Sequence, residues 1–177
     1  MQQNFNSSAQ IGSLIVSAFS LFFSVLALYI SRKSWQQSNR PIITARVTSA
    51  EPGGEKGTPL NIVVENTGNR PAINIRLSVP LNILESHLAD NQVTEQKYKT
   101  QITRIFSERG VISVLGNGKH ITNSFGFLSG GNIDSAWKDE ARMEISIYYE
   151  DLDGRKFTHR NPLFIAGDEG FASTSWN

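Results

Sequence analysis

The chain has 177 residues, of which 17 are basic, 16 are acidic and none is cysteine. This length fits one membrane anchor and one folded domain, and the missing cysteines exclude disulfides, thiolate metal sites and cysteine nucleophiles. Positions 1–40 hold three basic residues and no acidic ones, so positions 41–177 carry 14 minus 16, or −2, which excludes the strongly basic footprint of a nucleic-acid binder.

An uncharged run of twenty residues, 11–30, predicts a transmembrane helix. At about 1.5 Å per residue, such a run spans the roughly 30 Å hydrocarbon core of a bilayer. A cleaved signal peptide is the alternative, but residues 1–10 contain no Lys or Arg and the apolar run is long for one. We therefore expect a short extracytoplasmic tail over 1–10 and a transmembrane helix with a juxtamembrane extension over 11–38, ended by Pro41.

Aromatic and basic side chains near the end of this helix are candidate membrane-interface anchors. Tyr29 and Trp35 suit the headgroup belt. Arg32, Lys33 and Arg40 suit contact with anionic headgroups. The positive-inside rule then predicts a single-pass protein of a bacterial inner (plasma) membrane, with its N-terminus outside and its C-terminal domain in the cytoplasm. The reverse orientation, with a periplasmic domain, is the alternative.

One face of the predicted helix carries small residues at alternating spacings of four and three. This spacing is the a/d seam of a coiled coil, and small side chains let two helix backbones approach closely in a membrane. Only Gly12 and Ala18 are small residues off this face between positions 11 and 38. We expect the face to associate with a second copy or, alternatively, with the transmembrane helix of a partner. The helix-association face, called the serine seam below, consists of Ser13, Ser17, Ser20, Ser24, Ala27, Ser31, Ser34 and Ser38.

After Pro41 the helical periodicity gives way to alternating apolar and polar residues. Alternation over four to eight residues is typical of half-buried strands. We predict a mainly β fold, with seven or so short strands in an antiparallel sandwich over residues 41–166. The clearest predicted strands cover residues 43–47, 60–64, 73–79, 142–149 and 156–165, and the last two pair across the turn at 151–154.

The remaining segments are harder to assign. Residues 81–90 fit a short helix or a packed loop, and residues 101–106 fit a strand, although their apolar residues also satisfy a period of four. Strands at 111–115 and 120–128 flank Gly116-Asn117-Gly118, which predicts a hairpin. The polar segment 167–177 is expected to be a mobile C-terminal tail unless Trp176 docks.

Three motifs carry a resemblance to a known group of domains. They are the strand, Asn-x-Gly, Pro-Ala, strand pattern at 60–75, the Leu-Gly-Asn-Gly turn at 115–118 and the Tyr-x-Asp-x-x-Gly hairpin at 149–154. This combination resembles the immunoglobulin-like (CARDB-like) β-sandwich domains of bacterial single-pass membrane and surface proteins. The resemblance covers residues 41–165 and implies an immunoglobulin-like sandwich that binds partners, with no reaction attached.

Two loops resemble ligand-binding motifs but lack a required residue. Ser113 stands where a phosphate loop needs its first glycine, and His120 follows Lys119 where Ser or Thr is needed. A calcium loop that starts at Asp151 would need a carboxylate at Pro162. We therefore predict turns at both places.

The side chains that could support chemistry are few. His87, His120 and His159 show no metal-ligand spacing, although facing strands could bring two of them together. No serine lies in a nucleophile elbow. We predict no catalytic residue, metal site, cofactor or small-molecule substrate, and therefore no enzyme.

Three aromatic residues late in the chain have alternative roles. Trp137 could form an aromatic ligand platform or cap one end of the sandwich core. Tyr148 and Tyr149 are neighbours on one strand, so one should point into the core and the other outward as a contact candidate.

Together these patterns predict a membrane-anchored interaction module. Its helix would self-associate through the serine seam, and its sandwich would present strand edges or loops to a protein partner. The alternative is a membrane-disrupting effector, anti-phage or toxin-like, whose oligomerised helices permeabilise the bilayer along a hydroxyl-lined path.

Overall fold

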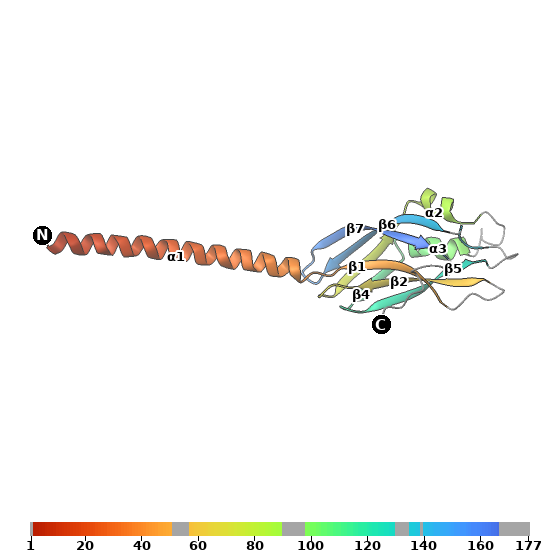
Figure 1. Cartoon of the computed structure of the whole chain (residues 1–177), viewed down its shortest axis with the longest axis horizontal. Coiled ribbons are helices and arrows are strands. Elements are labelled where there is room, and N and C mark those ends of the chain that lie inside the picture. Colours follow the sequence, from red (N-terminus) through yellow and green to blue (C-terminus); the bar gives the residue numbers. More distant parts are fainter. Residues whose placement is uncertain (1, 51–56, 90–97, 130–134, 139, 167–177) are drawn as a thin grey trace. The chain divides into compact units, whose positions relative to one another are not determined.

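The computed structural model describes residues 2–50, 57–89, 98–129, 135–138 and 140–166. They fall into two compact units, Met1–Arg40 and Pro41–Asn177, each drawn in Figure 1. The first unit is a single helix, α1, at Gln2–Ser38. It starts earlier than predicted because positions 2–10 hold no Pro or Gly that would stop a helix. The last helical hydrogen bond joins the Asn39 N–H to the Trp35 carbonyl at 2.9 Å, and Asn39 Nδ2 donates to the same carbonyl at 3.0 Å. The helix does not continue because Pro41 has no backbone N–H and disfavours a helical residue before it.

The second unit is the predicted antiparallel β-sandwich. Its seven strands form a three-stranded sheet in the order β1-β2-β5 and a four-stranded sheet in the order β4-β3-β6-β7. All five described strand pairs are antiparallel. The strands are β1 (Ile43–Ser49), β2 (Thr58–Asn66), β3 (Ala72–Ser78), β4 (Val111–Leu115), β5 (His120–Leu128), β6 (Ala141–Asp151) and β7 (Lys156–Ile165).

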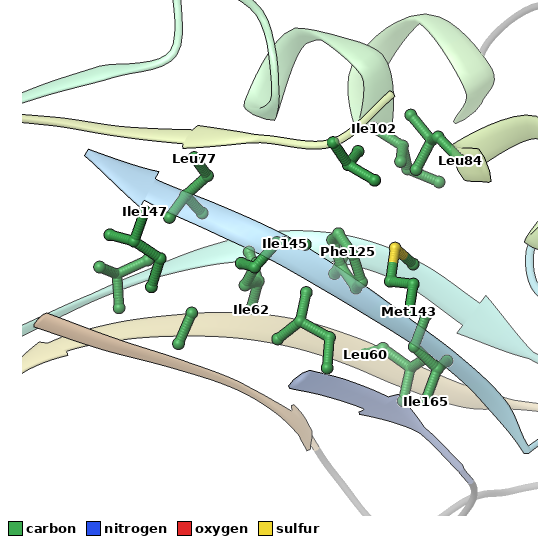
Figure 2. Packing of buried hydrophobic residues seen from close by; sticks show 14 of the residues in the cluster. Leu60, Ile62, Leu77, Leu84, Ile102, Phe125, Met143, Ile145, Ile147 and Ile165 are labelled. Carbon is green, nitrogen blue, oxygen red and sulfur yellow. The ribbon is translucent and has the colours of Figure 1, made fainter. Parts of the chain in front are cut away.

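The core lies between the two sheets and continues under the helices that join β3 to β4. Along β6 the burial alternates without interruption from Ala141 to Asp151, which is the burial pattern of a central strand with one covered face. Side chains from both sheets interdigitate there, and Leu84 and Ile102 close the layer beneath the helices (Figure 2). The predicted mainly β sandwich after an N-terminal apolar helix is therefore confirmed.

The predicted hairpin of 111–115 with 120–128 is wrong, because the two strands belong to different sheets. β4 pairs with β3, and β5 pairs with β2. The residues between them do turn, since Lys119 N–H donates to the Gly116 carbonyl at 3.2 Å. The turn is also bonded to the end of β2 through the Asn66 backbone, which donates to Lys119 O and accepts from Gly118 N, each at 2.9 Å. The chain therefore crosses to the other sheet instead of folding back on β4.

The predicted strand at 101–106 is also wrong. Lys99–Ile105 forms a helix, α3. The segment is helical because a period of four places Tyr98, Ile102 and Phe106 together against the core. Ile102 is buried. The Tyr98 ring contacts the Phe127 ring edge-on at a centroid distance of 5.2 Å, and the Phe106 ring contacts the Phe125 ring at 6.0 Å. Of the two readings for 81–90, the helix is correct: α2 covers Leu81–His87 and buries Leu84.

The predicted pairing of the last two strands is confirmed. β6 and β7 run in continuous register from Ala141↔Ile165 to Glu150↔Lys156. Gly154 has a φ of 77° in the connecting turn, a conformation that glycine adopts without strain. Residues 167–177 lie outside the described residues, so the prediction of a mobile tail there remains a prediction.

Candidate functional site

All eight residues of the serine seam lie on α1, and all eight side chains are exposed within that unit. The large apolar side chains beside the seam, among them Leu14, Phe19 and Phe22, are exposed as well. The stretch Gly12–Ser38 is 27 residues long and is apolar enough to cross a membrane. Lipid is the natural cover for such a surface, because water would make its exposure costly.

Two of the seam hydroxyls already have a partner inside the helix. Ser17 Oγ donates to the Ser13 carbonyl and Ser24 Oγ to the Ser20 carbonyl, both at 2.8 Å. A hydroxyl that bonds back to its own helix can enter an apolar environment without an unsatisfied donor. Close packing of the seam against another helix would therefore not leave these two donors unpaired.

The C-terminal half of the seam is recessed between larger side chains. A shallow hollow on this face is lined by Ala27, Ile30, Ser31, Ser34, Trp35, Ser38 and Asn39. Four of these seven residues are seam positions. The small side chains thus leave a groove on the helix surface, the shape that a neighbouring helix needs for close approach.

The predicted membrane-interface anchors lie at and just beyond the C-terminal third of α1. Tyr29 and Trp35 are exposed aromatic residues. Arg32, Lys33 and Arg40 are exposed cations. Arg32 and Lys33 lie between the two aromatic residues and Arg40 follows them, and the contact of all five with lipid remains a prediction.

One lateral side of the sandwich is closed by a side chain that sequence reasoning missed. Asn161 of β7 accepts from Ala45 N–H at 3.3 Å and donates to the Ala45 carbonyl of β1 at 2.8 Å. Its amide thus replaces a backbone pair between the edge strands of the two sheets. The two residues are 116 positions apart, so no local pattern points to the contact.

Among the described residues, no strand pair closes the opposite lateral side, between β4 and β5. A groove there is lined by residues of four strands, β2, β3, β4 and β5, and by the end of α3 with the loop after it, and its volume is about 240 Å³. We call it the β4–β5 groove. Sequence reasoning missed it because it follows from the assignment of β4 and β5 to different sheets.

Asn66, the asparagine of the Asn-x-Gly motif, joins three loops at one end of the sandwich. Its side chain is fully buried. Its Oδ1 accepts from the N–H groups of Ile42 and Gly68, and its Nδ2 donates to the carbonyls of Arg70 and Leu115. The motif residue therefore has a structural role, which accounts for the sequence pattern without a ligand.

Asp151, the aspartate of the Tyr-x-Asp-x-x-Gly motif, has a comparable structural role in the β6–β7 turn. It is fully buried and its Oδ1 accepts from the N–H groups of Asp153 and Arg155, both at 2.9 Å. Its Oδ2 lies 2.8 Å from Arg155 Nε. Oδ1 thus holds the backbone of the turn and Oδ2 is paired with the Arg155 guanidinium, so the predicted turn at this position is correct.

The neighbouring carboxylate, Asp153, gives a testable electrostatic prediction. Arg70 Nη1 donates to its Oδ2 at 2.7 Å, and this hydrogen bond with the charge of Arg70 lowers the pKa of Asp153 and raises that of Arg70. A lowered native pKa means that this pair stabilises the fold at pH values above the pKa of the unfolded chain, about 3.9. The contribution is lost as the pH falls through the native pKa.

We expect Arg70→Gln to move the pKa of Asp153 upward toward its ordinary value, because the donating cation is removed. A pH titration of the Asp153 carboxyl by NMR measures this. Arg46→Gln is the matched control, since Arg46 pairs with Glu65 on the β1-β2 sheet. An Asp153 pKa that stays low in Arg70→Gln would contradict the assignment.

The other candidates for chemistry are dispersed. His87 lies on α2, with Nδ1 2.7 Å from the Ile83 carbonyl oxygen, while His120 and His159 lie on β5 and β7. Within the described ranges no three His, Cys, Asp or Glu side chains come together as possible metal ligands. The absence of catalytic, cofactor and metal sites remains a prediction.

The structure shows which of the three aromatic candidates are buried and which is exposed. Trp137 is 1% exposed and packs against Phe125 at a centroid distance of 4.6 Å, so it is a core residue and not a ligand platform. Tyr149 is buried and Tyr148 is 45% exposed, which confirms that one points inward and the other outward. Tyr148 lies opposite Arg76 on the outer face of the four-stranded sheet.

The helix and the sandwich together match one protein family. No curated protein matches the chain at a significant level. The family match extends over residues 7–165, which includes most of α1 and every strand through β7. The chain therefore belongs to the family described as "Domain of unknown function (DUF8453)".

Proposed function

We propose that this protein is a membrane-anchored interaction module that self-associates through the serine seam and presents its β-sandwich to a protein partner. The observation that carries the proposal is the recessed, small-residue face of a helix long and apolar enough to span a membrane. Among the described residues no other helix is long and apolar enough to cross a membrane, so this face has no transmembrane partner there. A second copy is the simplest partner, because it brings the same face.

The hydrogen bonds of the seam support packing between helices. Ser17 and Ser24 donate within their own helix, so their hydroxyls can lie against another backbone without an unpaired donor. The repeat of 3.5 residues favours a left-handed crossing of the two helices. Anchoring in a bacterial inner membrane, with the sandwich in the cytoplasm, is part of the proposal.

The outer face of the four-stranded sheet supports contact with a protein. Tyr148 and Arg76 lie opposite each other on β6 and β3, and both are exposed. Tyrosine and arginine are enriched in protein interfaces, where they often supply much of the binding energy. Self-association of the helix would bring several copies of this face together and so raise avidity for a partner.

The serine seam predicts a strong effect of bulky substitutions. We expect Ser17→Leu, Ser20→Leu and Ser24→Leu together to lower the oligomeric fraction by about tenfold, because leucine holds the backbones apart. Chemical crosslinking of the full chain in native membranes, followed by denaturing gel electrophoresis, measures that fraction. Ser20→Leu and Ala18→Leu form a matched single pair, since both put leucine near the middle of the span and only the first lies on the seam.

Three results would contradict this function. Monomers in the unaltered protein, or equal effects of Ser20→Leu and Ala18→Leu, would remove the seam as an association face. Ion leakage from cells that express the unaltered chain, abolished by the triple substitution, would favour the membrane-disrupting effector.

A reporter fused after Asn177 tests the orientation, and we expect it to be active on the cytoplasmic side.

A further inference from the structure

The inner face of the sandwich is partly exposed at the start of β5. In the register of β2 with β5, Val64 pairs with Ile121. Paired residues point to the same face of a sheet, so Ile121 faces the same side as Val64, which belongs to the hydrophobic core. Ile121 is nevertheless 45% exposed. The described residues therefore leave the inner face of the sandwich partly uncovered at this point.

The β4–β5 groove is the apolar hollow beside this isoleucine. Its lining includes Ile62 of β2 and Leu77 of β3, which belong to opposite sheets and are nearly buried (Figure 2). Ile112 of β4 and Ile121 of β5 also line it. Its volume of about 240 Å³ is below the roughly 300 Å³ at which pockets for whole small ligands begin. The groove therefore suits one large apolar side chain.

A basic hollow of about 470 Å³ continues the groove toward α3. Four residues, among them Arg109 and Asn123, line both the hollow and the groove, so the two are continuous. The polar side chains of the basic hollow are Gln101, Arg104, Arg109, Asn123 and Ser124. Among the described residues, no Asp or Glu lines either the hollow or the groove. The site thus joins an apolar part to a positively charged part.

The two guanidinium groups of the basic hollow have no carboxylate partner. Arg104 and Arg109 are exposed, and neither forms an ion pair in the part of the chain that the structure describes. Several other arginines of the sandwich do pair with a carboxylate, namely Arg46, Arg70, Arg155 and Arg160. An acidic ligand could therefore bind Arg104 and Arg109 without displacing a carboxylate that the structure describes.

The loop that carries Arg109 is held against the end of α3. The Ser107 carbonyl accepts from the Gly110 N–H at 2.9 Å, and Ser107 Oγ accepts from the Arg109 N–H at 3.3 Å. The same hydroxyl donates to the Arg104 carbonyl at 2.8 Å. A side chain at Gly110 would collide with the Ile105 carbonyl, so the loop lies directly on the helix. The backbone that carries both arginines is therefore already in place, which lowers the cost of binding.

We propose that the β4–β5 groove and the basic hollow together bind an acidic segment of a partner protein that carries one large apolar side chain. The apolar side chain fills the groove, and carboxylates beside it pair with Arg104 and Arg109. An apolar centre beside a polar rim that contains arginine is the usual composition of a protein interface. This inference rests on the proposed presentation of the sandwich to a protein partner, and it adds the chemistry of the bound segment.

Side chains, and not an added strand, hold this segment. Part of the edge of β5 is already bonded, because the Phe125 carbonyl accepts from Trp137 Nε1 and the Phe127 carbonyl accepts from the Ala136 N–H. Recognition then depends on the charges of the segment and on its apolar anchor. Attraction between exposed charges is screened by salt, so we expect binding to weaken as the salt concentration rises.

Selection from a random peptide library tests the chemistry of the partner. The probe is a library displayed on phage, and the target is the full chain in nanodiscs of phosphatidylcholine, a lipid without net charge. We expect the enriched peptides to contain one large apolar residue flanked by Asp or Glu. No enrichment, or enrichment without an excess of acidic residues over the unselected library, would overturn the proposal.

Charge reversal in the basic hollow tests the site. Binding of one enriched peptide, synthesised with a fluorescent label, is measured by fluorescence anisotropy. We expect Arg104→Glu with Arg109→Glu to raise its Kd by about tenfold or more, because two attractions become repulsions. The matched control is Arg76→Glu with Arg160→Glu, which makes the same change in charge on the outer face of the four-stranded sheet. Equal effects of the two pairs would contradict the site.

A polar substitution in the groove tests the apolar anchor. We expect Ile121→Asp to raise the Kd of the same peptide by about tenfold, because a carboxylate in the groove disfavours burial of an apolar side chain. Val114→Asp is the control, since Val114 is an exposed valine of β4 that does not line the groove. Hydrogen exchange of the β7 amides should match that of the unaltered chain in every variant, which shows that the sandwich is folded. Equal losses in the two variants would count against the groove.

Two further results separate this inference from its alternatives. Protection of the amides of residues 120–124 without peptide, seen only when phosphatidylglycerol replaces phosphatidylcholine, would assign the basic hollow to lipid headgroups and overturn the proposal. Ser20→Leu should leave peptide binding unaltered, because the serine seam lies in the other unit. Oligomers that bind no acidic peptide would therefore refute this inference alone, and monomers that bind one would refute the seam alone.

Discussion

Trp137→Ala should destabilise the sandwich by about 3–5 kcal/mol, the usual cost of removing a fully buried large aromatic side chain. Trp137 packs on Phe125, and its Nε1 donates to the Phe125 carbonyl. Gly126, with a φ of 91°, lies directly against it, since a Cβ at this position would come within 3.1 Å of Nε1. The site has little freedom to collapse into the resulting cavity, because Trp137 lies between Phe125 of β5 and Leu88 at the end of α2, with which it forms an isolated β-bridge.

Denaturant unfolding of the full chain in detergent, followed by near-ultraviolet circular dichroism, measures this loss. Trp35→Ala is the matched control, because Trp35 is an exposed tryptophan of α1 and lies in the other unit. We expect its unfolding midpoint to equal that of the unaltered protein. A Trp137→Ala variant that is also unchanged would show that the core at this end tolerates a large void, contrary to its burial.

Asn66→Ala should cost about 3 kcal/mol or more, because each buried polar group that loses its partner costs about 1–3 kcal/mol. The substitution removes the partner of two N–H groups and two carbonyls, in residues Ile42, Gly68, Arg70 and Leu115. Gly68 and Arg70 follow Asn66 in the same loop. Ile42 and Leu115 are distant in sequence and belong to segments that this side chain holds to the loop.

The same unfolding measurement tests this prediction. Asn117→Ala is the control, since Asn117 is an exposed asparagine in the turn that crosses between the sheets. We expect a change of less than about 0.5 kcal/mol there. Equal effects of the two alanine substitutions would contradict the structural role of Asn66.

Local patterns were enough to predict the strands of the sandwich and the apolar helix. Alternating residues such as Ile43, Ala45 and Val47 report which face is covered, and this depends only on neighbours in sequence. The segment at 99–105 failed because three apolar residues four apart fit helix and strand alike. The contacts of Tyr98 and Phe106 with β5, which decide for α3, are not visible in the local sequence.

The strand partners and the groove could not be predicted, because they depend on pairing between strands that are distant in the sequence. The Gly116-Asn117-Gly118 turn has hairpin chemistry, yet β4 and β5 pair with β3 and β2. Because β4 and β5 do not pair with each other, the β4–β5 groove lies between them, and local sequence patterns could not predict it. Asn66 and Asp151 were found through motifs, but their role came only from the hydrogen bonds that bury them. The serine seam needed no tertiary information, because a helix of fixed pitch already places its members on one face.

The amide bridge from Asn161 to Ala45 has a mechanical consequence. Tension transmitted along α1 would enter the sandwich at β1, the first strand after Pro41. β1 is held on one side by seven residues paired with β2 and on the other by the two hydrogen bonds of Asn161. A pull along the strand loads such bonds simultaneously in shear, whereas a pull across it would break them one at a time. The first strand is thus fastened on both flanks against being drawn out of the fold by its tether.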